Sequence, residues 1–600
     1  MSFDHRLAIG IVTAIFAVMS TPALAPAPAI DWKPFTFTSG AGDTLTADSA
    51  RITVPENRAR STGRTIQIAV MRIRSTATRP GAPIIYLAGG PGGAGISGAR
   101  GELFPTVLAL RGVSDVILFD QRGTGVTLPS LVTRRTFGVP LAVSSTSAEA
   151  KKAMIDNSRA AAEEVRARGI DLTAYNTNEN ADDIDDIRQA LGVERLIVWG
   201  HSYGSHLGLT YIRRHGAHVD RAILGGINGP DHRRRFPKDG DVLFARLDSL
   251  IKATPSLRAV MPDFLGTTRR VLDRLAQQPA TVTVDSQPVL VGKEDVQSVI
   301  AISSGEAAFV RRLPQLIGQM DAGNFATMGR MVRDVIKNRP LGTVMTYMTD
   351  LASGVSDERM RAIRAQVPGA LLGNAINYPF DDPEFQAAWG APDLGPGFRT
   401  PIRSNVPTLF LSGTLDGRTS LSDAEEIRRG FTRGLRVDVN NASHNLYAAS
   451  PALLDIMVRF ARGETVRTVT LDAVNVELRG PDEQPLVDEL RAIIAKDGVS
   501  AAANRLREAA KPGSGHHVTG AFVNDLVIAF ARQDRAVAGA FLVAGLELFP
   551  GNSQLLTRRA EGEAAAGNTA AAIESYRAAI KADAFNQVAG VQLRRLEAPK

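Results

Sequence analysis

The sequence predicts an α/β fold: a mostly parallel sheet flanked by helices, with an inserted helical cap and an α-helical C-terminal appendage. Short apolar, β-branched runs alternate with helical patterns between about residues 50 and 230, which is typical of such a sheet. Two more runs of this kind follow only after a long, mainly helical stretch. The sheet is therefore expected to be interrupted by an insertion.

Composition excludes several classes of protein. The 600 residues are 44% hydrophobic and 22% charged, so the chain can bury a large core and is neither fibrous nor wholly disordered. The net charge of +7 is spread along the chain without a long basic run, and we expect no nucleic-acid partner. There is no cysteine, which excludes disulfides and thiol catalysis, and no HExxH pair. We expect no metal and no cofactor.

The N-terminal segment is typical of a secretory signal. Arg6 precedes an apolar stretch from Leu7 to Met19, which is shorter than the ~20 residues that span a bilayer. Small residues in Ala27-Pro28-Ala29 suit cleavage after Ala29. We expect an exported protein, periplasmic or secreted, with no membrane span in the mature chain. An uncleaved N-terminal anchor is the alternative.

The strands can be assigned in order along the chain. One run alternates apolar and polar residues, as a half-buried strand does, and the other apolar runs are suited to buried parallel strands. The alternating run is Ile66–Ile73, and the others are Ile84–Leu87, Val116–Phe119, Leu196–Trp199, Ala222–Leu224, Thr408–Leu411 and Arg436–Val439.

A nucleophile motif follows one of these strands. Gly200-His201-Ser202-Tyr203-Gly204 is a G-x-S-x-G between a predicted strand and a helix expected to begin near Ser205. So sharp a reversal holds the serine in a strained conformation, and the glycines avoid collisions two residues to either side. Ser202 is therefore the candidate nucleophile, whereas the pentapeptide alone could be a mere tight turn.

A base and an orienting carboxylate are also present at the ends of strands. Asp416 follows Thr408–Leu411, and His444 follows the next strand. The order Ser, Asp, His is that of an α/β-hydrolase, so we predict a Ser202-Asp416-His444 triad. Taken alone, His444 could equally be a capping or core histidine.

A glycine-rich turn can supply the oxyanion hole. Ala88-Gly89-Gly90-Pro91-Gly92-Gly93 follows the Ile84–Leu87 strand. Two backbone N–H groups must point at the oxyanion before it forms. We assign one donor to Tyr203 and the other to Gly90, with Gly89 as the alternative.

Together these motifs resemble a known family. The Gly89–Gly92 loop, Phe119–Gly125 with its Asp-Gln-Arg-Gly turn, and the Ser202 motif are similar to those of the prolyl and tripeptidyl aminopeptidases, which are α/β-hydrolase serine peptidases. The resemblance covers roughly residues 40 to 465. It implies exopeptidase action at a free N-terminus, with Ser202 as nucleophile, His444 as base and Asp416 orienting it.

The sequence departs from the family pattern in places. Ala88 stands where the oxyanion loop typically begins with His, and Ser205 replaces a common glycine. The family's ammonium-binding carboxylates are expected in the cap, where no motif identifies them. The candidates are Asp381, Asp382, Glu384 and Glu306, although solvated surface acids are the default interpretation of all four. We interpret Arg122 as a brace of its loop.

The C-terminal part of the sequence has a pattern that predicts a helical architecture, different from that of the α/β core. Ala538, Leu542, Gly545 and Pro550 match Ala572, Tyr576, Ala579 and Ala584 at a constant offset of 34 residues, the tetratricopeptide period. So short a repeat should dock on the hydrolase, on another subunit or on a protein partner; a plain helical tail is the alternative. The predicted organisation is signal peptide 1–29, hydrolase core 30–230 and 400–465, cap 231–399, connector 466–515 with one helix, and tetratricopeptide-like region 516–600.

These predictions lead to one function and two alternatives. We expect an exported serine aminopeptidase that releases N-terminal residues or short peptides through an acyl-enzyme. A serine esterase or amidase acting on small acyl substrates is the first alternative, because the same triad serves both. A catalytically inactive binding module is the second.

Overall fold

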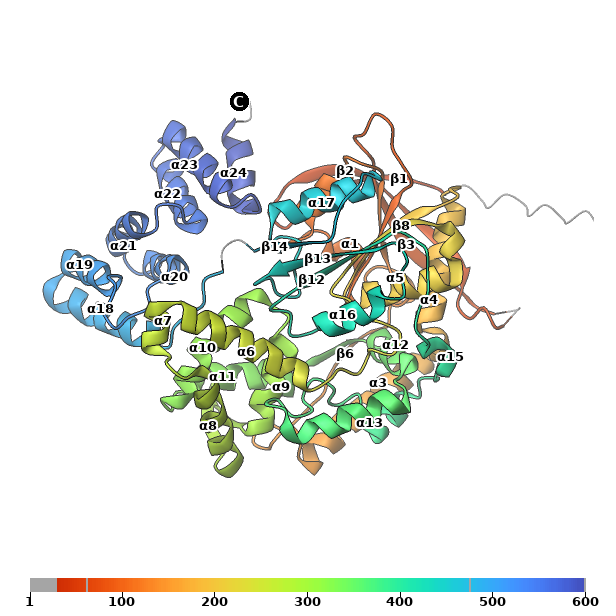
Figure 1. Ribbon diagram of the computed structural model, residues 1–600, viewed down its shortest axis with the longest axis horizontal. Helices are drawn as coiled ribbons and strands as arrows, with labels where there is room; N and C mark the ends of the chain where they lie inside the picture. Colours follow the sequence, from red (N-terminus) through yellow and green to blue (C-terminus); the bar gives the residue numbers. More distant parts are fainter. Residues whose placement is uncertain (1–29, 61–62, 474–475, 598–600) are drawn as a thin grey trace, which may run out of the picture.

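The computed structural model describes residues 30–60, 63–473 and 476–597 (Figure 1). The predicted signal peptide and its cleavage after Ala29 lie outside the described residues. Within these residues, no helix is both long and apolar enough to cross a membrane.

A sheet of ten strands runs through the described part of the chain in the order β1-β2-β3-β5-β4-β7-β8-β12-β13-β14. The first four are antiparallel neighbours, and from β5 to β14 all pairs are parallel. The strands are β1 Lys33–Thr38, β2 Thr44–Pro55, β3 Thr65–Ile73, β4 Ile84–Leu87, β5 Val116–Asp120, β7 Leu196–His201, β8 Val219–Gly225, β12 Thr408–Gly413, β13 Gly434–Asn440 and β14 Val469–Asp472. All seven predicted strands are present, and the predicted fold class is confirmed.

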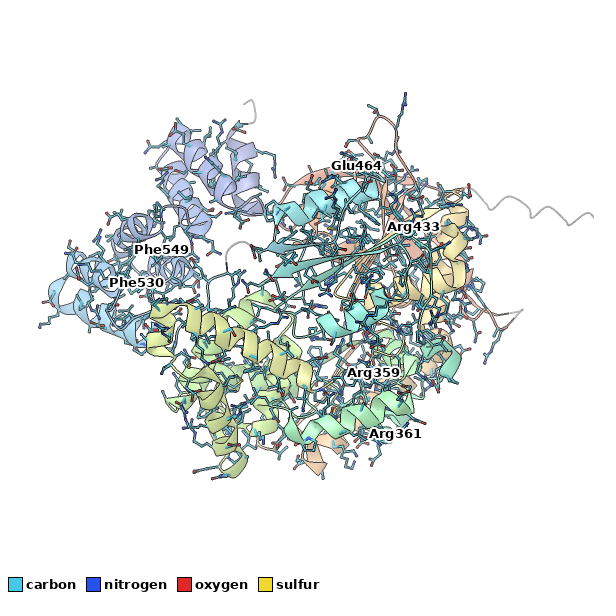
Figure 2. All side chains as sticks on the ribbon, in the orientation of Figure 1. Arg359, Arg361, Arg433, Glu464, Phe530 and Phe549 are labelled. Carbon is cyan, nitrogen blue, oxygen red and sulfur yellow. The ribbon has the colours of Figure 1, made fainter. Side chains whose placement is uncertain are left out.

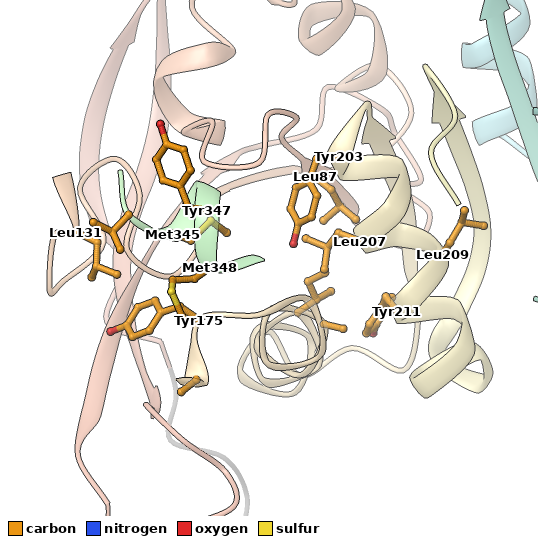
Figure 3. Packing of buried hydrophobic residues seen from close by; sticks show 14 of the residues in the cluster. Leu87, Leu131, Tyr175, Tyr203, Leu207, Leu209, Tyr211, Met345, Tyr347 and Met348 are labelled. Atoms are coloured by element: carbon orange, nitrogen blue, oxygen red, sulfur yellow. The ribbon is translucent and has the colours of Figure 1, made fainter. Parts of the chain in front are cut away.

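Helices cover both faces of the sheet. β4, β5 and β7 are buried along their whole length, as expected for strands enclosed on both sides. Figure 3 shows one of the two cores, in which Leu87 of β4 packs near Tyr203 and Leu207. The helices on this side are α3 Ala148–Arg166, α4 Thr177–Ala190, α5 Tyr203–His215 and α16 Leu421–Arg428. Those on the other are α1 Gly95–Gly98, α2 Phe104–Leu110 and α17 Pro451–Ala461.

The insertion lies between β8 and β12, which are neighbours in the sheet. It is mainly helical, as predicted, with its own core. Its helices are α6 Lys238–Ala253, α7 Pro255–Val260, α8 Phe264–Gln277, α9 Lys293–Ser303, α10 Ala307–Asp321, α11 Ala326–Met331, α12 Met345–Ser353, α13 Asp357–Gln366, α14 Pro383–Trp389 and α15 Pro396–Arg399. It also holds an unpredicted hairpin, β9 Ala280–Val284 with β10 Gln287–Val291.

Two connections attach this cap to the sheet domain. Strand β11, Pro340–Thr343, pairs with β6, Val132–Thr136, which leaves the sheet domain between β5 and α3. On α13, Arg359 (Figure 2) donates to Asp423 of α16 at 2.9 Å. Because both side chains are buried, this ion pair fixes the position of the cap against the sheet domain.

The C-terminal part is a row of helices. They are α18 Glu483–Asp497, α19 Val499–Ala509, α20 Gly520–Ala531, α21 Arg535–Leu548, α22 Ser553–Ala565, α23 Thr569–Ala582 and α24 Gln587–Glu597. The expectation of a single helix in 466–515 was wrong: Gly498, at φ +85°, separates α18 from α19. Both helices share a core with α20 and α21. The tetratricopeptide assignment stays a prediction.

The helical appendage contacts both the cap and the sheet domain. Ser256 Oγ of α7 lies 2.8 Å from Nδ1 of His517, and Gln315 of α10 donates to Glu483 at 2.7 Å. At the far end, Gln587 donates to the carbonyl oxygen of Gly101 at 3.1 Å. The appendage therefore docks within the chain, one of the arrangements expected from the sequence.

Candidate active site

Ser202 lies at a sharp turn between β7 and α5. Its backbone has φ +56° and ψ −121°, a region that side-chain-bearing residues rarely adopt. A Cβ on Gly204 would collide with the carbonyl oxygen of Leu87, and one on Gly200 with that of Gly204. Glycine is therefore required at both positions because a side chain would collide with the backbone, as expected from the sequence. The turn leaves the Ser202 side chain only half-buried.

Ser205, the departure from the family pattern, fastens this turn. Its hydroxyl donates to the carbonyl oxygen of Ser202 at 2.6 Å and accepts from the backbone N–H of Asn228 at 2.9 Å. The backbone N–H of Ser202 donates to Gly225 at 2.8 Å. The turn is thus tied to the loop after β8, a contact that a glycine could not make through a side chain.

Asp416 and His444 lie in the loops after β12 and β13, as predicted. His444 Nδ1 is 2.7 Å from Oδ2 of Asp416. The carboxylate also accepts from the hydroxyl of Thr419 at 2.6 Å and from the backbone N–H of Arg418 at 2.7 Å. Burial alone would raise the pKa of Asp416, but His444 and these hydrogen bonds outweigh it and hold the pKa at about 2. Asp416 is therefore a carboxylate at any physiological pH.

The imidazole of His444 lies beside the Ser202 turn. Its ring packs against that of His201, with 4.8 Å between the centroids. A Cβ on Gly226 would come within 2.7 Å of Cε1 of His444, so the ring also rests on the loop after β8. Because Asp416 occupies Nδ1, Nε2 is the nitrogen left for a serine hydroxyl.

The predicted oxyanion loop lies against Ser202. A Cβ on Gly89 would be 3.0 Å from Cβ of Ser202, and Gly90 has φ +117°, which favours glycine. Gln121 donates to the carbonyl oxygen of Ala88 at 3.0 Å and holds the start of the loop. Tyr203 is the first residue of α5, where a backbone N–H has no intrahelical acceptor. The two predicted donor positions therefore border Ser202, the candidate nucleophile.

Arg122 braces the neighbouring turn and is fully buried. It donates to both carboxylate oxygens of Asp183, at 2.8 and 2.7 Å, and to the carbonyl oxygens of Glu56 and Ala174, at 2.7 and 2.6 Å. All these partners are internal, which agrees with the interpretation of Arg122 as a brace.

The sequence comparison decides the family. A model of the alpha/beta hydrolase fold matches residues 82–451, more than half of the chain. The chain belongs to the α/β-hydrolase family.

Curated relatives of this hydrolase carry peptidase names. A tripeptidyl aminopeptidase of Streptomyces coelicolor is 36% identical over 205 residues, which cover 32% of this chain and 38% of the relative. A probable proline iminopeptidase of the same organism is 29% identical over 147 residues, covering 24% and 33%. The serine protease Hip1 of Mycobacterium bovis is 25% identical over 187 residues, covering 30% and 36%. Each match therefore spans less than two fifths of the relative's own length.

Solved structures match this hydrolase at low identity and low TM-score. The crystal structure of a proline iminopeptidase from Mycobacterium smegmatis is 17% identical, covers 69% of this chain and 98% of that chain, and gives a TM-score of 0.34. An esterase from Exiguobacterium antarcticum is 14% identical and covers 67% of this chain and 97% of that chain, with a TM-score of 0.29.

Three of the four acids considered for an ammonium site have other partners in this hydrolase. Asp382 pairs with Lys151 at 2.9 Å and caps α14, and Glu384 is 3.2 Å from the same ammonium. Asp381 accepts from Asn374. Glu306 differs: it accepts from Asn445, the residue after His444, at 3.3 Å.

Sequence reasoning missed a second acid near this place, Glu102. Glu102 and Glu306 line one cavity of about 610 Å³, and Glu102 lines a second of about 270 Å³ together with His201. Partial desolvation and then the charge of Glu306 raise the pKa of Glu102. No sequence signal links the two acids, because Glu102 precedes α2 and Glu306 precedes α10, in different parts of the chain.

One group of residues has the composition of a metal site. His232, Asp423 and Glu426 offer ligand atoms within 4.8 Å of one another. However, Asp423 already accepts from the Arg359 guanidinium at 2.9 Å, and this positive charge opposes a cation. We therefore interpret His232, Asp423 and Glu426 as part of an ion-pair cluster and not as a metal site.

Proposed function

We propose that this hydrolase is an exported serine aminopeptidase that releases N-terminal residues or short peptides through an acyl-enzyme. In this mechanism Ser202 attacks the scissile carbonyl carbon while Nε2 of His444 takes its proton. Asp416 holds the imidazole and stabilises its positive charge. The backbone N–H groups of Tyr203 and Gly90 receive the oxyanion. His444 returns the proton to the leaving amine, and water then releases the acyl group by the reverse steps.

One observation carries this proposal. Ser202 is held at φ +56° beside a histidine whose Nδ1 is bonded to a buried carboxylate at 2.7 Å. Such strain persists where the surrounding structure enforces it, and it is concentrated at active sites. The peptidase names of the relatives support a peptide substrate.

Glu306 and Glu102 are the candidates to bind the substrate ammonium. They lie near His444 and His201, and neither forms an ion pair with a basic residue within the described ranges. The raised pKa of Glu102 reflects repulsion that a bound ammonium would relieve. Because both side chains are exposed, we expect a modest contribution to binding.

The decisive experiment compares matched peptidyl anilides with free and acetylated N-termini, alongside a short-chain nitrophenyl ester. We expect wild-type turnover of free-amine peptides that collapses on acetylation and in Ser202→Ala. Ester cleavage without peptide cleavage would identify a small-acyl esterase instead. Turnover that persists in Ser202→Ala would contradict the proposed acyl-enzyme mechanism.

The ammonium site has its own test. Glu306→Gln is expected to raise KM for free-amine peptides about fivefold and to leave ester hydrolysis unchanged. Glu384→Gln is the matched control, because it removes a cap carboxylate that pairs with Lys151. Equal KM changes in both variants would contradict the assignment.

Export is tested separately. N-terminal sequencing of protein recovered outside the cytoplasm should begin at Ile30. Protein retained in the cytoplasm would contradict this part of the proposal.

A further inference from the structure

A cavity of about 200 Å³ adjoins the predicted oxyanion loop, and five arginines are among its lining residues. Gly90 and Pro91 form part of its wall, and Ala301 and Ile302, at the end of α9, form another part. The arginines in its wall are Arg233, Arg234, Arg235, Arg339 and Arg418. We call it the arginine cavity.

The positive charge of this cavity exceeds its negative charge. Asp350 is the one carboxylate among the lining residues, and it already binds Arg233 and Arg234. Within the described ranges, Arg235, Arg339 and Arg418 form no ion pair with an acid. Five guanidinium groups and one carboxylate thus line the cavity, and the charges of Asp416 and Glu306 also act on Arg418.

Partners of these arginines are mostly neutral. Arg418 donates to the carbonyl oxygen of Ile302 at 2.6 Å, and Arg339 lies over the ring of Phe137. With its side-chain amide turned to satisfy its hydrogen bonds, Asn228 accepts from Arg233 and Arg235 at 3.1 Å. The Nε–H of Arg233 is buried and has no partner within the described residues. Hydrogen-bonding capacity therefore remains for a ligand.

The arginines also repel one another. Burial, followed by the charges of Arg418 and Arg233, lowers the pKa of Arg235 to about 9. Burial, followed by Arg339 and Arg233, lowers that of Arg418. In both cases the lowering outweighs the nearby carboxylates, Asp416 among them. A bound anion would relieve the repulsion between these positive charges.

We propose that the arginine cavity is a specificity subsite that binds a carboxylate of the substrate. This inference rests on the proposed peptidase function and narrows it to peptides that carry a carboxylate near the scissile bond. Guanidinium groups bind carboxylates with two parallel hydrogen bonds. Since Gly90 belongs to both the cavity wall and the proposed oxyanion hole, a substrate held there extends directly toward the arginines.

Two sources of the carboxylate are distinguished by two sets of peptide pairs with free N-termini. The first pair differs only in a C-terminal acid or amide on a neutral tetrapeptide. The second pair is amidated and carries Glu or Gln, moved through each position in turn. We expect kcat/KM to favour one carboxylate over its neutral partner by at least about tenfold, with the preference falling at high salt.

Variants assign the preference to the cavity. Arg339→Gln should reduce the acid-to-neutral ratio of kcat/KM to near one, and Arg339→Lys should restore part of it. The ratio is taken within each variant, so a general loss of activity cancels. Arg433→Gln is the control, because Arg433 is an exposed arginine outside the cavity lining (Figure 2) and its variant should keep the wild-type ratio.

A binding measurement keeps the two proposals separate. Calorimetry of the same peptides with Ser202→Ala, and with Ser202→Ala combined with Arg339→Gln, needs no turnover. Tighter carboxylate binding that the second substitution removes supports the subsite even if no peptide is cleaved. Turnover of neutral and acidic peptides at equal kcat/KM, with equal binding, overturns the subsite and leaves the peptidase proposal standing.

Discussion

The rings of His201 and His444 lie against each other, with 4.8 Å between their centroids. Burial and then the charge of His444 lower the pKa of His201 to about 3, so His201 is neutral at physiological pH. Because His201 is neutral, it places no second positive charge beside the imidazolium that His444 would form. The proposed base thus has one charged partner, Asp416, and one neutral partner, His201.

Acidification should weaken the fold through His201. Its folded pKa of about 3 lies below its ordinary value of 6.5, so below about pH 6.5 the unfolded chain takes up a proton that the folded chain refuses. The free energy of unfolding should fall by up to about 1.4 kcal/mol per pH unit from this group until about pH 3. Urea unfolding between pH 7 and pH 4 should show a shallower slope in His201→Phe. Identical slopes would contradict this origin.

Asp416→Asn should lower kcat about 10³- to 10⁴-fold, because an amide cannot stabilise the imidazolium or fix the correct tautomer. Thr419 and the backbone of Arg418 hold the carboxylate in place, so the folded structure should persist by circular dichroism. Asp438→Asn, at a residue of β13 paired with Arg436, is the control and should change kcat less than twofold. A similar effect in both would exclude a special role for Asp416.

Gly204→Ala should destabilise the protein by more than about 3 kcal/mol, because its Cβ would collide with the carbonyl oxygen of Leu87. Gly216, at the other end of α5, has φ −59° and open space around its Cβ position. Gly216→Ala should therefore be neutral or stabilising by about 0.4–1 kcal/mol. Thermal and urea unfolding of the two variants give the comparison, and a Gly204→Ala protein of wild-type stability would refute the close packing.

Arg122→Met should cost about 3–5 kcal/mol of stability, because it leaves the buried Asp183 facing only the shared guanidinium of Arg58. The exposed pair of Arg159 and Asp156 provides the contrast. Arg159→Ala should change the free energy of unfolding by less than about 0.5 kcal/mol. Equal losses in the two variants would show that burial does not set the strength of the Arg122 pair.

Sequence patterns predicted the central strands and placed the residues of the proposed triad at their carboxyl ends. Strands β7 and β12 are buried along their whole length, and Ser202 and Asp416 follow them, whereas His444 follows β13, in which buried and half-buried residues are mixed. The edge strands β1 and β14 are mostly exposed and carry no such signal. The split between α18 and α19 depends on one glycine.

Substrate-binding groups were harder to predict. The arginine cavity draws Gly90, Arg235, Arg339 and Arg418 from distant segments, so no spacing marks it. Glu102 and Glu306 are likewise brought together only by the packing of the cap and the appendage around them. Such contacts depend on tertiary structure, whereas the turn that holds Ser202 is encoded in the five consecutive residues Gly200–Gly204.

The appendage connects the cap to the sheet domain through contacts at its two ends. Its first helix is hydrogen-bonded to α10 of the cap, and its last to the loop before α2 in the sheet domain. Because the appendage ties the cap to the sheet domain, the cap cannot swing open like a hinged lid unless these contacts break. We therefore expect substrates to reach Ser202 while the cap keeps its place over the sheet domain.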